Sequence, residues 1–187
     1  MDQRSDVEDD VVLDKGFAYL VEHMGGDRAV VQAARVCYRS DGLDDPVKDS
    51  KLISYLMAHE HWTPFEHAVL KFHVKAPIFV ARQWFRHRSS SYNEVSGRYA
   101  EMKDEFYVPE MWRGQDTKNR QGSAGELDGD AQEECDAIIA SANGDSMARY
   151  RALLARGVSK EMARFVLPVN LFTEFYWTVN ARNLMAF

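Results

Sequence analysis

The sequence contains only two cysteines, Cys37 and Cys135, and neither belongs to a CxxC pair. This scarcity argues against a disulfide scaffold and a cysteine-based zinc site, and favours a reducing, cytoplasmic setting. No apolar run approaches the length of a bilayer span, and the charged N-terminus lacks the apolar segment of a signal peptide. We therefore expect a soluble protein that does not act at a membrane.

Positive charge is also scarce. The 187 residues include 23 Lys+Arg against 29 Asp+Glu, for a net charge of −6. An acidic chain of this kind is a poor candidate for a general nucleic-acid-binding protein. With 45% apolar and 12% aromatic residues it is rich enough to build a core, and its length is that of one domain.

Two common phosphate-binding loops are missing, because neither GxGxxG nor GxxxxGK[ST] occurs. Any phosphate must then be held mainly by side chains. His59 and His61, with His67 and His73 further on, lack the i, i+4 spacing of a helical zinc pair, so we expect no metal site.

The hydrophobic pattern changes period along the chain and predicts a mixed α/β domain of the α+β type. We expect a mostly antiparallel sheet with flanking helices and an additional helical segment. Phe172, Phe175, Tyr176 and Trp177 are predicted to lie in its core. The expected helices cover 27–37, 47–59, 77–85, 135–154 and 159–167, and the expected strands cover 11–13, 68–74 and 169–177.

Two further segments stand apart from this pattern. Residues 113–130 combine four glycines with polar side chains and are predicted to be a mobile polar loop. Residues 180–187 resemble the opening of a helix that is too short to be stable alone. Either packing holds this segment, or the chain is a truncated form.

A basic island lies in the middle of this acidic chain. Between residues 82 and 98, four arginines and one glutamate give a local charge of +3. Guanidinium groups match phosphate oxygens, hydroxyls complete the shell, and interleaved aromatic rings can stack on a heterocycle. The island therefore favours a nucleotide site. A solvated charged face and, more weakly, a nucleic-acid contact are the alternatives.

The order of residues inside this island resembles a known family. Residues 86–99 match RHRxxSxNExSxRY, the signature of flavin-dependent thymidylate synthases. The likeness extends to His61-x-Thr63-Pro64-Phe65-Glu66-His67, to Ala76–Phe85, and to the segments 163–168 and 177–182. It covers most of the chain, and nine specified positions in fourteen make the motif highly specific.

The resemblance implies a reaction and a set of partners. The family methylates carbon 5 of dUMP to make dTMP, with methylenetetrahydrofolate as the carbon donor, FAD as the flavin and NADPH as the reductant. Its members are homotetramers whose active sites lie between subunits. No role for nucleic acid or membrane is implied.

The same resemblance implies individual roles. His61 and Arg98 match catalytic positions, His61 near the flavin and folate and Arg98 as an orienting or polarising group. The dUMP contacts are expected at Gln83, Trp84, Phe85, Arg86, Glu94, Val95, Ser96, Gly97, Arg98 and Arg164. The FAD contacts are expected at Thr63, Arg86, His87, Arg88, Glu94, Asn180, Ala181 and Arg182.

The sequence departs from the family near residue 187. Ala186 stands where the family has an asparagine, and the arginine that polarises the uracil ring would follow Phe187. We therefore expect residues 1–187 to be one synthase-like domain truncated at its C-terminus. The alternative to a full synthase is a weak or inactive homologue that binds flavin and nucleotide.

Overall fold

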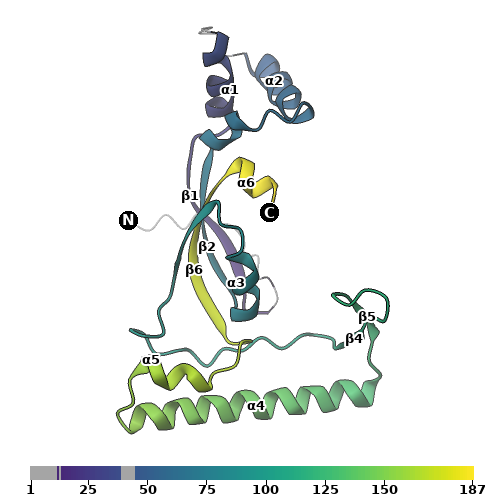
Figure 1. Cartoon of the computed structure of the whole chain (residues 1–187), viewed down its shortest axis with the longest axis vertical. Helices are drawn as coiled ribbons and strands as arrows, with labels where there is room; N and C mark the ends of the chain where they lie inside the picture. The colour runs from purple at the N-terminus through teal and green to yellow at the C-terminus, as the bar shows by residue number, and fades with distance from the viewer. Residues whose placement is uncertain (1–11, 13, 39–44) are drawn as a thin grey trace.

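The computed structural model describes residues 12, 14–38 and 45–187, and its centre is a four-stranded sheet. Every neighbouring pair of strands is antiparallel. Helices α1 and α2 lie at one end of this sheet, and α4 and α5 lie at the other (Figure 1). The predicted α+β architecture is thus confirmed. The strand order is β1 (Phe17–Met24), β2 (Val69–Pro77), β6 (Phe172–Asn180), β3 (Ser90–Glu94).

The predicted strands 68–74 and 169–177 exist, but each begins and ends later in the chain; of the predicted strand 11–13, residues 11 and 13 lie outside the described residues. β2 runs to Pro77, where the proline closes the strand, and β6 begins at Phe172, so that Val169 lies outside it and is exposed. Tyr176 was predicted in the core, and this is wrong. Its ring is 43% exposed because alternate residues of β6 face opposite sides of the sheet.

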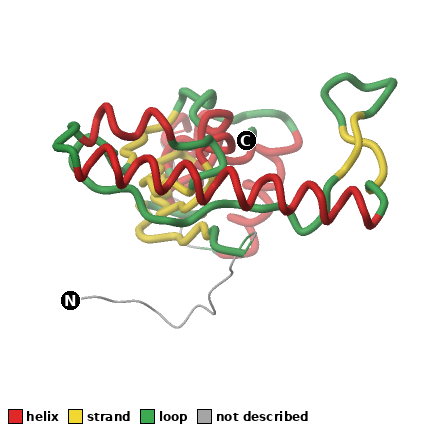
Figure 2. The backbone as a smooth tube through the Cα atoms, turned by 90° about the horizontal axis from the view of Figure 1, so that it is seen from below, coloured by secondary structure: helices red, strands yellow, loops and turns green. Residues whose placement is uncertain are grey.

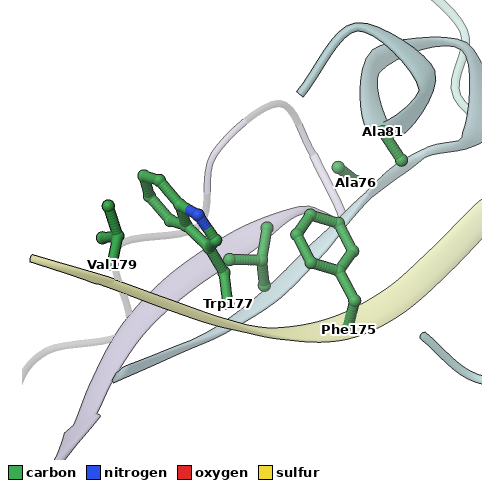
Figure 3. Packing of buried hydrophobic residues seen from close by; sticks show 6 residues of the cluster. Ala76, Ala81, Phe175, Trp177 and Val179 are labelled. Carbon is green, nitrogen blue, oxygen red and sulfur yellow. The ribbon is translucent and has the colours of Figure 1, made fainter. Parts of the chain in front are cut away.

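The core of the sheet lies on the face covered by α3 (Ile78–Trp84). Val74 and Ala76 of β2 pack there against Phe175, Trp177 and Val179 of β6 (Figure 3). Pro77 was predicted in the first turn of this helix but is its N-cap, so that α3 begins one residue later than predicted. The helix continues the strand directly, and Trp84 and Phe85 at its end still pack against this core.

A second hydrophobic cluster lies among the helices near the N-terminus. These are α1 (Asp27–Arg35), α2 (Pro46–Ala58) and the short 3₁₀ helices η1 (Val36–Tyr38) and η2 (Thr63–His67). Val30, Leu56, Phe65 and Ala68 are buried together there. Asp27 was predicted as a cap but occupies the first turn of α1, and Cys37 is exposed on η1. The next helix, α2, does have an aspartate cap: Asp45 accepts hydrogen bonds from Val47 N and Lys48 N.

A third cluster joins α4 (Gly129–Ala155), α5 (Lys160–Ala163) and η3 (Arg164–Val166) to the far end of the sheet. Met147 and Tyr150 pack against Ala163 and Leu171. α4 begins six residues before the predicted start, and Ile138 is 61% exposed because this half of the helix reaches beyond the core (Figure 2).

The segment 113–130 is not a loop throughout. β4 (Arg113–Gln115) pairs with β5 (Ser123–Glu126), and this hairpin stands near the start of α4 (Figure 2). Local hydrogen bonds close the hairpin, because Asp116 Oδ1 accepts from the N–H groups of Lys118 and Asn119. These bonds also lower the pKa of Asp116, that to Lys118 most. The mobility of this segment stays a prediction.

The segment after β6 forms α6 (Ala181–Met185), and packing holds it in place. Asn180 caps it by accepting a hydrogen bond from Asn183 N at 2.9 Å, and Leu184 packs against the core of the sheet. The Phe187 ring lies 4.8 Å from that of Trp84 and 4.9 Å from that of Trp177.

Candidate functional site

The basic island runs along the edge strand β3, and this strand divides its motif in two. Arg86–Arg88 precede the strand and Ser96–Arg98 follow it, and the strand between them, Ser90–Glu94, spans about 13 Å from its first to its last residue at 3.3 Å per residue. We call the two regions the RHR end, after Arg86–Arg88, and the SGR end, after Ser96–Arg98. The predicted site residues divide between them.

The RHR end is a tight turn closed by hydrogen bonds to main-chain oxygens. The Tyr92 hydroxyl donates to His87 O at 2.7 Å and also lies 3.1 Å from Trp84 O. The Ser90 hydroxyl donates to the same His87 oxygen at 2.8 Å. The backbone of this turn is therefore rigid, whereas the side chains of Arg86, His87 and Arg88 are exposed.

The remaining predicted flavin contacts gather around this turn. Asn183 Nδ2 donates to Ser89 O at 3.2 Å, which ties α6 to the start of β3. Ala181 N donates to Ala68 O at 2.8 Å, and Arg182 forms an ion pair with Glu66 of η2. Because Thr63 begins the same 3₁₀ helix, it belongs to this region as well.

The arginines of the RHR end lack acidic partners among the described residues. Neither Arg86 nor Arg88 forms an ion pair with any acidic residue in the part of the chain that the structure describes. A small pocket of about 80 Å³ opens beside them, lined by residues 87–90, Trp177, Val179 and Asn183. Ligand pockets usually measure some 300–1,000 Å³, so this pocket holds only a fragment of a cofactor.

The chemistry of this donor set fits a flavin dinucleotide. Two guanidinium groups that pair with none of the described acidic residues offer forked donors to a diphosphate, and hydroxyl and amide groups lie beside them. The indole N–H groups of Trp84 and Trp177 are buried without an acceptor among the described residues. The region as a whole thus presents donors in excess of acceptors.

His61 lies just before η2, at the end of α2. His61 N donates to Leu56 O at 2.9 Å and Glu60 N donates to Met57 O at 3.1 Å, the two bonds of a Schellman motif. Glu60 holds the left-handed position of that motif, with φ of +57°. The His61 side chain is exposed and meets the Tyr55 ring edge-on at 6.2 Å.

The SGR end is organised around Glu161. Its carboxylate forms an ion pair with Arg98, with 3.2 Å between Oε1 and Nε, and its main-chain oxygen accepts a hydrogen bond from Arg164 Nε at 3.3 Å. Gly97 is buried against Arg164, and a Cβ at this glycine would lie 3.2 Å from Arg164 Cδ. The two predicted nucleotide-binding arginines are thus brought together by a residue of α5.

Glu94, at the end of β3, is oriented by the neighbouring strand. Thr173 of β6 donates its hydroxyl proton to Glu94 Oε1 at 2.7 Å. Val95 N donates to Glu174 O, which continues the pairing by one residue beyond the ladder, and the Val95 side chain is 44% exposed. The carboxylate of Glu94 therefore lies at the SGR end rather than beside Arg86–Arg88.

The α3 residues of the predicted nucleotide set lie between the two ends. Gln83 is exposed, but Trp84 and Phe85 pack against the core of the sheet. The Phe85 ring lies 4.7 Å from Tyr92 and 4.9 Å from Phe175. The structure thus gives both aromatic residues a packing role, and their predicted contacts with a base stay a prediction.

The densest ionic network lies on the opposite face of the sheet. Lys103 donates to Glu174 at 3.1 Å, and this hydrogen bond, with the charge of Glu174, raises the pKa of Lys103. His73 lies 3.5 Å from the same carboxylate and stacks on Tyr176. None of these groups belongs to the predicted site.

Sequence reasoning missed the residues that hold the site residues in place: Glu66, Glu161, Thr173 and Asn183. A weak signal existed for Glu161, which precedes Arg164 by three residues on one helical turn. Thr173 contacts Glu94 across 79 positions and Arg182 contacts Glu66 across 116, so no local pattern marks either pair. No group of three or more His, Cys, Asp or Glu side chains in the described segments is placed to hold a metal ion.

Comparisons with known proteins agree on one family. The model of the family described as thymidylate synthase complementing protein matches residues 19–187. The chain is 56% identical over 176 residues to the flavin-dependent thymidylate synthase of Thermus thermophilus, covering 94% of this chain and 64% of the relative. It is 53% identical to that of Thermosipho africanus, covering 94% and 77%. The chain thus spans somewhat less than two thirds of the Thermus relative.

A solved structure shares the fold. The crystal structure of the UMP/dUMP methylase PolB from Streptomyces cacaoi, bound with 5-Br dUMP, matches with a TM-score of 0.82 and 37% identity. The match covers 91% of this chain and 75% of that one. As for membrane spans, none of the helices in the described residues combines the length and apolarity that a crossing requires.

Proposed function

The chain belongs to the family of flavin-dependent thymidylate synthases, and we propose that it catalyses the reductive methylation of dUMP to dTMP. Methylenetetrahydrofolate supplies the carbon and NADPH the reducing equivalents in this proposal. The observation that carries it is the division of the motif. Exposed guanidinium groups that pair with no acidic side chain in the described segments lie at one end of β3, and two arginines that both contact Glu161 lie at the other.

The RHR end holds the FAD in this proposal. Arg86 and Arg88 bind its phosphates, and Thr63, His87, Asn180, Ala181 and Arg182 surround it. When bound, the flavin supplies the hydride that the methyl group needs. The rigid turn at His87 keeps the donors at fixed positions, because its carbonyl accepts the Tyr92 and Ser90 hydroxyls. Binding therefore orders only side chains.

The SGR end holds dUMP. Arg98 and Arg164 offer forked donors, and Ser96, Gly97 and Val95 present hydroxyl and backbone groups beside them. Glu94 contributes a carboxylate, while Gln83, Trp84, Phe85 and Arg86 belong to the nucleotide set of α3. Carbon 5 becomes nucleophilic when charge developing on the uracil ring is stabilised by aimed donors, and Arg98 is the donor proposed here.

His61 is the second proposed catalytic group. Its imidazole is exposed on the segment leading into η2, two residues from Thr63, and so faces the flavin side of the site. The Schellman motif fixes its backbone through the bond to Leu56. A histidine at this place can position or protonate groups of the folate near neutral pH.

We also propose that the active protein is a homotetramer with shared sites. The two ends of β3 lie about 13 Å apart, and the pocket at the RHR end is too small for a nucleotide. Large apolar side chains are exposed near the SGR end, with Phe165 at 74% and Tyr99 at 78%. A neighbouring chain covering these surfaces would complete both pockets.

The test combines a spectrum with a turnover assay. We expect the purified chain to keep a flavin absorption band through gel filtration at the mass of an oligomer. NADPH oxidation should rise on addition of dUMP, and tritium should be released from dUMP labelled at carbon 5. A colourless protein that takes up no added FAD would contradict the proposal. Binding of both ligands without tritium release would instead identify an inactive homologue.

A further inference from the structure

Thr173 is unusual among the residues on its face of β6. Phe175, Trp177 and Val179 follow it at alternate positions and are all apolar and buried. Thr173 is itself 3% exposed, and among the described residues its side chain and that of Asn143 are the polar ones classed as buried. A buried hydroxyl costs stability unless it forms a hydrogen bond. Its position therefore calls for a partner.

That partner is the carboxylate of Glu94. The hydroxyl donates to Oε1 at 2.7 Å, a short distance that fits a hydrogen bond to a charged acceptor. The two residues are diagonal neighbours across β3 and β6, because Glu94 pairs with Phe175, two positions beyond Thr173. The contact thus joins the edge strand of the motif to the central strand of the sheet.

Among the residues that the structure describes, only Thr173 forms a hydrogen bond with the Glu94 carboxylate. Arg98, the nearest arginine in sequence, is paired with Glu161, and Glu94 itself forms no ion pair within the described part of the chain. Its side chain is exposed and carries three rotatable bonds, so it would sample many positions without the Thr173 bond. With Oε1 occupied by Thr173, Oε2 remains available to a ligand.

We propose that Thr173 is a positioning residue for the nucleotide site, and that its hydroxyl orients the Glu94 carboxylate toward dUMP. The proposal rests on the proposed function, because it takes dUMP as the ligand of the SGR end. Packing alone does not require a hydroxyl here. Valine has nearly the same shape as threonine, favours strands, and would leave no buried hydroxyl to satisfy.

The test is Thr173→Val, with dUMP affinity and thermal stability measured on the same preparation. We expect dUMP to bind about fivefold more weakly, which is the typical size of one hydrogen bond, while the melting temperature stays the same or rises. Thr173→Ser should restore affinity to within about twofold, because it returns the hydroxyl. Thr178→Val is the matched control, since Thr178 lies on the same strand but the opposite face.

A second comparison assigns the effect to Glu94. In a Glu94→Gln background, Thr173→Val should cost less than in the unsubstituted chain, because the charged acceptor is gone. Equal affinity of Thr173→Val and the unsubstituted chain for dUMP would overturn the positioning role and leave the proposed function intact. Loss of affinity that Thr173→Ser does not restore would also overturn it. Absence of dUMP binding by the unsubstituted chain would overturn both.

Discussion

At the SGR end of β3, Arg98 and Arg164 both bond to Glu161, whereas Arg86 and Arg88 at the RHR end have no acidic partner among the described residues. The two ends also differ in what holds their backbones. Hydrogen bonds to the His87 carbonyl close the RHR turn, while side-chain contacts organise the SGR end. One end thus offers charge on a rigid turn, and the other offers side chains already oriented. The first suits strong phosphate binding, and the second suits selective orientation of a ring.

The largest expected effect is a loss of ligand affinity when an arginine at either end is removed, and the two ends should lose affinity for different ligands. Arg86→Ala should weaken both FAD and dUMP binding by about 10- to 100-fold, because it removes a charge-assisted donor that pairs with no described acidic residue. Arg164→Ala should weaken dUMP binding by a similar factor and leave FAD unchanged. Flavin fluorescence and dUMP titration measure the two affinities, with Arg149→Ala on α4 as the control. Equal losses of FAD affinity in both variants would abolish the distinction between the ends.

Gly97→Ala tests how closely the SGR end depends on packing. The new Cβ would lie 3.0 Å from Met102 Sδ and 3.2 Å from Arg164 Cδ, so the Arg164 side chain must shift. We expect dUMP affinity to fall up to about tenfold, with little loss of stability because both neighbours are flexible side chains. In Gly144→Ala, the control, the new Cβ meets nothing within 4 Å. An unchanged dUMP affinity for Gly97→Ala would show that dUMP binding does not depend on the position of the Arg164 side chain.

The helices α2 and α4 each end at a residue with a left-handed backbone, but the residue type differs. Gly157, with φ of +82°, ends α4 before Glu161, and Glu60, with φ of +57°, ends α2 before His61. Gly157→Ala should therefore lower the free energy of unfolding by about 1 kcal/mol, and Glu60→Gly should raise it by up to about 1 kcal/mol. Chemical denaturation measures both changes. Shifts of the same sign would contradict the left-handed assignment of one of the two residues.

The smallest expected effect is the pH dependence of the cap that starts α2, on the RHR side. Hydrogen bonds from the backbone N–H of Lys48, and less strongly from Val47, lower the pKa of Asp45 below its ordinary value of 3.8. The resulting stabilisation is present above that value and is lost as the pH falls through the pKa of the folded state. Melting temperatures between pH 3 and 6 should show this loss, and Asp45→Asn should flatten it. Identical profiles for the two proteins would show that the cap does not titrate.

Several strands and helices were predictable because their signals are local, although β1 and β3 were not predicted. Alternation marked β2 and β6, Pro77 marked the start of α3, and Gly157 marked the end of α4. Errors arose where a local signal was outweighed. Asp27 is a good capping residue but lies inside the first turn of α1, and Tyr176 alternates onto the open face of the sheet. The segment 113–130 seemed to be a loop because three- and four-residue strands leave almost no periodic pattern.

The candidate site was predictable as a set of residues but not as a geometry. The spacing of the motif residues from Arg86 to Tyr99 is chemically specific, and it sufficed to identify the family. No pattern in the sequence, however, indicates that β3 would hold Arg86–Arg88 and Ser96–Arg98 apart, since that follows from pairing with β6.

The sequence by itself therefore determined the family, the types of donor available to phosphates and a ring, and most of the secondary structure. These depend on residue identity and on neighbours a few positions away. Only the tertiary structure decided which donors remain free and which are held by other residues. Thr173 with Glu94, and Glu66 with Arg182, meet because distant segments pack around one sheet. A hydrogen bond forms between atoms that are close in space, whatever their separation along the chain.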